Sequence, residues 1–218
     1  EAPLKPWLDT LVDKGILEDI FALRLCGPGE LGSHLKLGGM DESVDASRLM
    51  YTAIVEARYF AIDAPIFTLG EVELGSGDEE TIVDSGPTLL MVPLEVHAAL
   101  VTALKAAAEA QGVAAQIPDG LWTESPSDIS ARATLSESEV AALPALTLTL
   151  KGEGPGERFQ LQVPPERYFR RTSSGGVYLG VRPGLGTTIL GQVFLEGLDV
   201  VFDRAEKRIG FVTTDCEG

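Results

Sequence analysis

The acidic residue best placed for chemistry is Asp84, within the segment TIVDSGPTLLMVP at positions 81–93. Apolar residues precede and follow it, so we expect the flanking chain in buried strands and the carboxylate on the turn between them. A carboxylate in such surroundings needs hydrogen-bond donors, and Ser85 and the backbone N–H of Gly86 could supply them. Asp-Ser-Gly is also a common Asx turn, and taken alone the three residues favour that structural interpretation.

Two carboxylates that share one proton can hydrolyse a peptide bond, because one activates a water molecule while the other protonates the carbonyl oxygen. Asp84 alone cannot do this, so a second aspartate is required. A metal site is not expected, since His34 and His97 are the only histidines and the sequence contains no Cys-x-x-Cys. The sequence predicts neither a metal nor an organic cofactor.

The composition is typical of a globular domain, with 218 residues, 44% hydrophobic and 23% charged. The net charge of −16 argues against nucleic-acid binding, which needs a basic surface. No apolar run reaches the length of about 18 residues that indicates a membrane span, and we expect any targeting signal to be absent or already removed. Counting alone leaves open whether the two cysteines, Cys26 and Cys216, are free or paired.

Alternating apolar and polar residues predict many short strands and hence a mostly-β fold in a single domain. The expected strands lie at 20–27, 32–41, 49–74 (three strands), 145–150, 158–163 and 176–181, and a last hairpin turns at 204–207. Segment 151–157, KGEGPGE, is glycine-rich and predicts a second hairpin. These strands must position the turn that carries Asp84.

Few helices are expected. The clearest spans 94–111, opened by Pro93 and stopped by Gly112, with its apolar face on Val96, Leu100 and Leu104. A short helix is expected before Gly15, and a capping box of Ser136 and Glu139 predicts another over 136–143. Segment 112–134 is expected to be irregular. Three aromatic residues are expected in the core: Trp7, Trp122 and Phe194.

Three stretches change the interpretation of Asp84. They are LCGPGELGSHLKLGGMD at 25–41, IVDSGPTLLMVP at 82–93 and TTILGQVFLEGLDVVFDRAEKRIGFV at 187–212. In this order and spacing they resemble the C-terminal lobe of the pepsin-like aspartic proteases, the pepsin family A1, over essentially the whole chain. The resemblance implies a pepsin-like acid protease fold: residues 1–218 form one mostly-β lobe with a few short helices. The N-terminal lobe, with the second catalytic aspartate, is then absent from this chain.

The resemblance also implies roles for individual residues. Asp84 is one of the two catalytic aspartates, and the Ser85 hydroxyl locks the two active-site loops together. Gly86 and Thr88 bind the backbone of the substrate. Tyr59 matches a tyrosine that lines the primed side of the cleft, although an ordinary core aromatic is an equal alternative.

One residue of the motif departs from the family pattern. Pro87 stands where the family usually has Thr or Ser, and proline supplies neither a hydroxyl nor an N–H. The aspartate therefore lacks one customary donor, which fits either an active enzyme with a shifted pH optimum or a lobe released from catalysis. Ile189 and Leu190, before Gly191, are expected to form a strand that threads past the Asp84 loop.

Within the family, the chain is similar to the beta-secretase (memapsin) branch in the stretches FALRLCG, IPDGLW, EGLDVVFDRAEKRIGF and TTDC. The resemblance to that branch implies a disulfide between Cys26 and Cys216, although two further disulfides expected in this lobe have no cysteines here. It also implies a protein of the secretory pathway, endomembrane or extracellular, and it allows a membrane anchor after Gly218.

Two functions follow as hypotheses. The first is an aspartic endopeptidase that hydrolyses peptides or proteins together with an N-terminal lobe, supplied by the same precursor or by a separate chain. The alternative is a catalytically inactive pepsin-like lobe that acts as a binding, inhibitor or structural subunit. An intact or a degenerate aspartate motif in the partner lobe would distinguish them.

Overall fold

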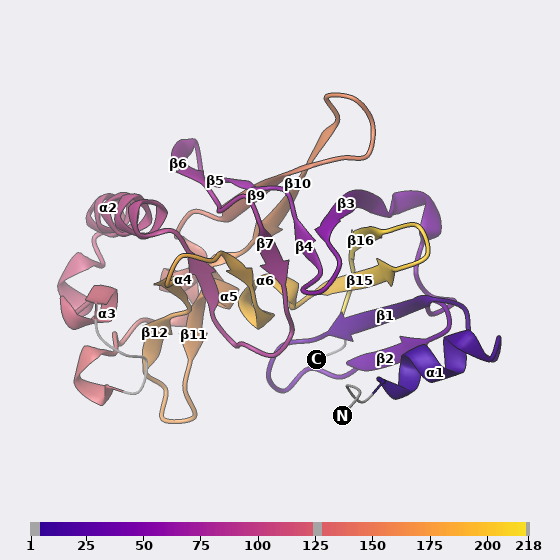
Figure 1. Cartoon of the computed structure of the whole chain (residues 1–218). Helices are drawn as coiled ribbons and strands as arrows, with labels where there is room; N and C mark the ends of the chain where they lie inside the picture. The colour runs from indigo at the N-terminus through magenta and orange to yellow at the C-terminus, as the bar shows by residue number, and fades with distance from the viewer. Residues whose placement is uncertain (1–4, 124–127, 217–218) are drawn as a thin grey trace.

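A computed structural model describes residues 5–123 and 128–216, and these residues form a mostly-β lobe with short helices (Figure 1). Most of its strands belong to one sheet in the spatial order β13-β8-β14-β7-β4-β3-β16-β15-β1-β2. The bounds of these strands are β1 (Ile20–Leu25), β2 (His34–Leu37), β3 (Met50–Glu56), β4 (Ala61–Ile62), β7 (Thr81–Val83), β8 (Leu90–Val92), β13 (Val181–Pro183), β14 (Ile189–Leu190), β15 (Leu198–Asp203) and β16 (Arg208–Thr213). The expected mostly-β, pepsin-like fold is confirmed.

Two smaller sheets complete the described part of the lobe. One has the order β10-β9-β5-β6 and the other pairs β11 with β12. The bounds are β5 (Ile66–Leu69), β6 (Val72–Ser76), β9 (Leu146–Lys151), β10 (Arg158–Val163), β11 (Phe169–Arg171) and β12 (Val177–Leu179). The predicted glycine-rich hairpin joins β9 to β10, with Lys151 opposite Arg158.

The longest described helix is α2 (Leu94–Ala110), which follows Pro93 and ends before Gly112, a residue in the left-handed region at φ 73°. The capping box of Ser136 and Glu139 is present at the start of α4. The remaining helices are α1 (Trp7–Asp13), α3 (Gly120–Thr123), α4 (Glu137–Ala141), α5 (Pro165–Tyr168) and α6 (Gln192–Leu195), with 3-10 turns η1 (Ala46–Arg48), η2 (Ala114–Gln116) and η3 (Ile129–Ala131). The segment expected to be irregular therefore contains short helical turns.

The core forms where α2 packs on the strands. Val96, Leu100 and Leu104 are buried on one face of the helix, as its apolar spacing predicts. Trp122 and Phe194 are also buried, but Trp7 is 62% exposed, so its assignment to the core was wrong. The physical reason is that α1 contributes no buried residue to the described lobe.

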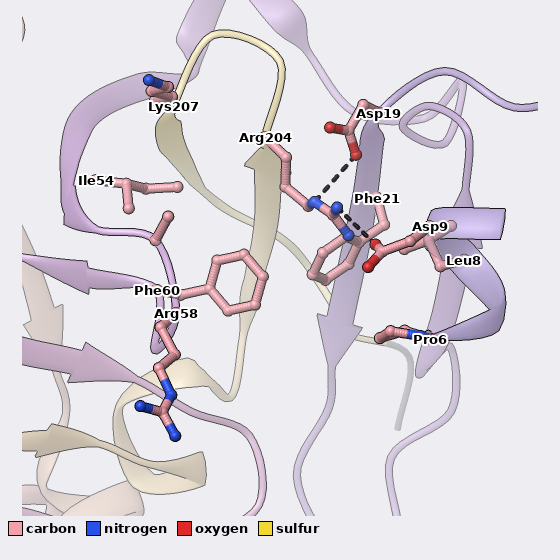
Figure 2. A pocket seen from close by; sticks show the side chains of 11 residues that line it. Pro6, Leu8, Asp9, Asp19, Phe21, Ile54, Arg58, Phe60, Arg204 and Lys207 are labelled. Carbon is pink, nitrogen blue, oxygen red and sulfur yellow. Dashed lines mark hydrogen bonds and ion pairs between the residues drawn. The ribbon is translucent and has the colours of Figure 1, made fainter. Parts of the chain in front are cut away.

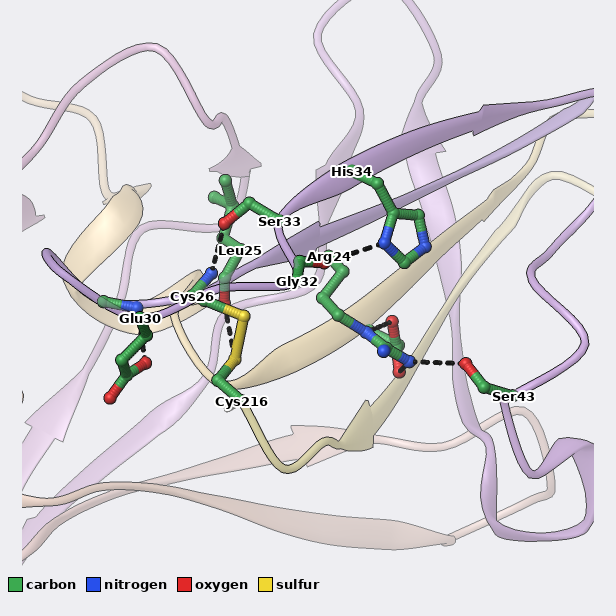
Figure 3. Close-up of a disulfide and its surroundings, with 11 residues drawn as sticks. Arg24, Leu25, Cys26, Glu30, Gly32, Ser33, His34, Ser43 and Cys216 are labelled. Atoms are coloured by element: carbon green, nitrogen blue, oxygen red, sulfur yellow. Dashed lines mark hydrogen bonds and ion pairs between the residues drawn. A yellow bond between two sulfur atoms is a disulfide. The ribbon is translucent and has the colours of Figure 1, made fainter. Parts of the chain in front are cut away.

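Long-range contacts fix the β1 end of the large sheet. The Arg24 guanidinium donates two hydrogen bonds to the Asp199 carboxylate, of 2.8 and 2.7 Å, across the β1–β15 pair. Figure 3 shows Arg24 near the disulfide between Cys26 and Cys216. This disulfide confirms the implied pairing. The bond ties the end of β1 to the chain just after β16, and so it closes a span of 190 residues.

No helix in the described parts of the chain combines the length and the apolar composition needed to cross a bilayer. Gly218, after which the resemblance allows an anchor, lies outside the described residues.

Candidate active site

The Asp84 loop connects β7 to β8, and a third strand runs between them. β14 pairs in parallel with β7, with Ile189 opposite Ile82, and it also contacts β8, with Ile189 opposite Met91. The backbone N–H of Asp84 donates to the Leu190 carbonyl, at 3.2 Å. The predicted strand past the Asp84 loop is therefore confirmed, and it fixes the start of that loop.

The residue after β14 explains why a glycine is needed there. A Cβ at Gly191 would lie 2.2 Å from the Leu89 carbonyl oxygen and 2.6 Å from that of Pro87, well inside van der Waals contact. This close approach lets the start of α6 reach the loop. The backbone N–H of Gln192 donates to Pro87 at 2.9 Å, and that of Val193 donates to Thr88 at 3.0 Å. The loop is thus fastened at both of its ends.

The side chain of Asp84 is exposed on this loop. Its Oδ1 accepts a hydrogen bond of 2.8 Å from the backbone N–H of Gly86, the donor expected from the sequence. A Cβ at Gly86 would come within 3.1 Å of Oδ1, so a larger residue there would crowd the carboxylate. The segment therefore forms the Asx turn considered from the sequence, and this turn leaves the Asp84 carboxylate exposed.

A hollow of about 300 Å³ lies beside the carboxylate. Its walls are mostly apolar, and they are formed by Phe21, Leu23, Leu35, Phe60, Val83, Asp84, Ser85 and Phe202. Phe21 stacks on Phe202 with ring centroids 4.6 Å apart, and Phe60 meets Phe202 edge-on at 5.0 Å. Phe60 adopts a left-handed backbone at φ 51°, which is uncommon for a bulky residue. No local sequence pattern predicts this aromatic wall.

A second hollow, of about 580 Å³, shares Phe21 and Phe60 with the first (Figure 2). Arg204, from the turn between β15 and β16, contacts Asp9 at 2.7 Å and Asp19 at 3.0 Å. These ion pairs join the last hairpin to α1 and to the residue preceding β1. The turn at 204–207 was predicted, but its ion pairs were not, because their partners lie far away in the sequence.

The structure brings the predicted motif residues together on one loop. Ser85 and Thr88 are exposed, and the Thr88 carbonyl accepts a hydrogen bond from the backbone N–H of Val193. Tyr59 is 49% exposed, with the Arg58 guanidinium 5.0 Å from its ring centroid, so the core alternative for Tyr59 was wrong. Tyr59 is not among the residues that line either hollow, although its neighbour Phe60 lines the one beside Asp84, so its assignment to the primed side stays a prediction.

In the described ranges, one group of possible metal ligands comes together: Cys26, Glu30 and Cys216. Both sulfur atoms belong to the disulfide, so neither is available as a thiolate ligand. Figure 3 shows Glu30 beside them. It accepts a hydrogen bond of 2.7 Å from the Gly27 backbone, which gives the carboxylate a structural role.

Sequence reasoning also missed a contact that Gln192 makes at this site. The side-chain amide of Gln192 donates a hydrogen bond of 3.0 Å to the carbonyl of Ser85. The two residues are 107 positions apart, and only their places on either side of the β7–β14 crossing bring them together. The position directly after Gly191 was the one available signal.

Comparison with known proteins agrees with this geometry. The model of the eukaryotic aspartyl protease family matches residues 2–214. Beta-secretase of Strongylocentrotus purpuratus is 28% identical over 100% of this chain and 45% of its own length. Cathepsin D of Mus musculus is 29% identical over 92% of the chain and 45% of its own length, and pepsin A of Sus scrofa is 27% identical over 94% and 49%. The chain thus spans about half the length of the curated relatives it matches.

Proposed function

The chain belongs to the eukaryotic aspartyl protease family, and from that premise we propose that it is the C-terminal lobe of a two-lobed aspartic endopeptidase. Asp84 is one member of the catalytic pair, and the second aspartate comes from an N-terminal lobe of the same precursor or of a separate chain. The observation that carries the proposal is the exposed Asp84 carboxylate, held by Gly86 on a loop that β14 and α6 fasten.

The chemistry proposed for the pair uses one proton shared between two carboxylates. The ionised carboxylate removes a proton from the bound water, which attacks the carbonyl carbon of the peptide. The protonated carboxylate gives its proton to the carbonyl oxygen, so a tetrahedral diol forms. Collapse of the diol breaks the C–N bond: a diol hydroxyl returns its proton to the ionised carboxylate as the new C=O forms, and the leaving amine takes up the proton of the other carboxylate, so the dyad again holds one shared proton. Asp84 can serve in either role, since its side chain is open to the hollow.

Two features of the lobe support the proposal that a second lobe contacts it. β2 is an edge strand of the large sheet, and its Leu35 is 57% exposed. Leu35 also lines the apolar hollow beside Asp84. Proteins usually cover an unpaired edge strand and the exposed apolar side chains on it, because both invite non-specific contacts. A second lobe that contacts β2 and the hollow would cover both and bring its aspartate towards Asp84.

The proposed substrate is an extended peptide or protein segment. Gly86 and Thr88 lie on the Asp84 loop and are exposed, which suits contacts with a substrate backbone. Tyr59 has a half-exposed ring and directly precedes Phe60, which lines the hollow, and we assign its side chain to the primed side of the cleft. The disulfide supports an oxidising compartment, as in the secretory pathway or outside the cell.

The alternative function is a binding, inhibitor or structural subunit without proteolysis, and Pro87 is the observation that favours it. Mass spectrometry of the natively purified protein under non-reducing conditions decides between the two. A companion of similar size with an intact Asp-Thr/Ser-Gly motif, on the same or another chain, supports the protease. No companion, or one in which that aspartate is replaced, supports the binding subunit.

A further inference from the structure

One peptide unit of the active-site loop is held at both of its ends. Its carbonyl belongs to Ser85 and its N–H to Gly86. The N–H donates to Asp84 Oδ1 at 2.8 Å, and the carbonyl accepts from the Gln192 side chain at 3.0 Å. The Gln192 amide and the Asp84 carboxylate therefore hydrogen-bond to opposite edges of the same planar peptide unit.

Of the hydrogen bonds that α6 gives to the loop, this one depends on residue type. Any residue but proline would supply the backbone donors of positions 192 and 193, which bind Pro87 and Thr88. Only a side chain with an N–H or O–H donor and the length of glutamine reaches the Ser85 carbonyl. Gly191 makes this reach feasible, because its missing side chain lets α6 start against the loop.

We propose that Gln192 is a positioning residue of the active site, which holds the Ser85–Gly86 peptide so that its N–H stays aimed at the Asp84 carboxylate. The inference rests on the proposed protease function and adds to it. It also accounts for how the loop tolerates Pro87, which removes a hydroxyl donor that the family pattern places next to the aspartate. In this lobe the Gln192 side chain, at the start of α6, holds in place the Gly86 N–H, which still donates to the aspartate.

The physical basis is the coupling of two hydrogen bonds through one amide. A bond donated to a carbonyl polarises the peptide and strengthens the N–H at its other end, and a fixed plane keeps that N–H aligned. Without the Gln192 donor, the peptide is free to rotate about its flanking bonds, and the ionised form of the aspartate loses part of its stabilisation. Contacts between the substrate and residues away from the Ser85–Gly86 peptide should change little.

The test uses the complete two-lobed protein and the substitutions Gln192→Met and Gln192→Glu. Methionine matches the length of glutamine without a donor, and glutamate matches its shape while adding a negative charge near Asp84. Gln162→Met, at an exposed position of β10 in a different sheet, is the matched control. The readouts are kcat and KM across pH, the melting temperature, and the hydrogen-exchange rate of the Gly86 amide measured by NMR.

We expect Gln192→Met to lower kcat about tenfold, the worth of one typical hydrogen bond, with a smaller change in KM that comes from the proposed contact of Gly86 with the substrate. The acid limb of its pH–rate profile should move to higher pH, and more so for Gln192→Glu. The Gly86 amide should exchange faster in both variants, while Gln162→Met behaves as the wild type. An unchanged exchange rate at Gly86, or a fall in melting temperature with unaltered kcat and pH profile, overturns the inference.

Asp84→Asn, measured in parallel, separates this inference from the proposed function. If Asp84→Asn abolishes cleavage and the Gln192 variants behave as the wild type, the protease stands and the positioning role fails. If the complete protein cleaves no peptide, the protease proposal fails, and the Gly86 exchange rate still decides whether Gln192 holds the loop.

Discussion

Gly191 and Leu89 approach so closely that no side chain fits between them, since a Cβ at position 191 would lie 2.2 Å from the Leu89 carbonyl oxygen. This contact lies where β14 ends and α6 begins, and the first backbone N–H groups of α6 donate to the loop of Asp84. The site therefore depends on a backbone-to-backbone contact that only glycine permits at position 191. This contact sets the position of the chain on both sides of it.

Gly191→Ala should separate α6 from the loop and break the bonds to Pro87 and Thr88. We expect the free energy of unfolding to fall by about 1–3 kcal/mol, because the clash is with backbone that cannot rotate away. Chemical denaturation measures this loss. Gly27→Ala is the control, since its Cβ would meet only the flexible carboxylate end of Glu30, at 3.2 Å. Equal stability of the two variants would contradict the account of the crossing.

Replacing both Cys26 and Cys216 by serine should lower the free energy of unfolding by about 4–5 kcal/mol, because the disulfide restricts a span of 190 residues in the unfolded chain. Guanidinium denaturation with and without a reductant checks the prediction. The wild type should lose stability on reduction, whereas the double variant should not respond. If the reductant left the free energy of unfolding of the wild type unchanged, the disulfide would contribute nothing to stability.

His97 on α2 predicts a loss of stability in acid. Burial, and next the charge of Arg182 on β13, lower the pKa of His97 below its ordinary value of 6.5. The unfolded chain then binds a proton more readily than the folded one, so this contribution to stability is present above about pH 6.5 and is lost as the pH falls. The free energy of unfolding between pH 7 and 5 should therefore fall less in His97→Gln than in the wild type. A His97→Gln slope equal to that of the wild type would refute the prediction.

Pro87→Thr tests the departure from the family pattern. The carbonyl that binds the Gln192 N–H remains, and threonine adds the hydroxyl donor that the resemblance places next to the aspartate. In the complete protein we expect cleavage to be retained and the acid limb of its pH–rate profile to move to lower pH, because an added donor stabilises the ionised carboxylate. Pro28→Thr, in the exposed loop after β1, is the control. An unmoved profile would mean that the hydroxyl does not reach Asp84.

What the sequence could predict was set by local patterns and by the resemblance. Helix α2 and the β9–β10 hairpin carry their periodicity and stop signals within a short window, so their positions were predicted. The crossing of β14 past the Asp84 loop is a contact between distant segments, and it came from the resemblance. Local patterns contain no information about such pairings.

The parts that escaped prediction depend on tertiary contact. α6 is too short to show a helical period, and its role comes from where Gly191 places it. Phe60 takes its left-handed backbone from the junction of β3 with β4, which propensity does not encode. The Gln192 contact joins residues 107 positions apart, and the exposure of Trp7 reflects how α1 sits on the rest of the described lobe.

The central claim is that Asp84 carries out the chemistry of the complete protein. Peptide cleavage should be compared between the wild type, Asp84→Asn and the control Asp119→Asn, whose carboxylate is fully exposed near α3. We predict that Asp84→Asn lowers kcat by on the order of 10⁴-fold with an unchanged melting temperature, and that Asp119→Asn has no effect. Cleavage by Asp84→Asn at the wild-type rate would contradict the account.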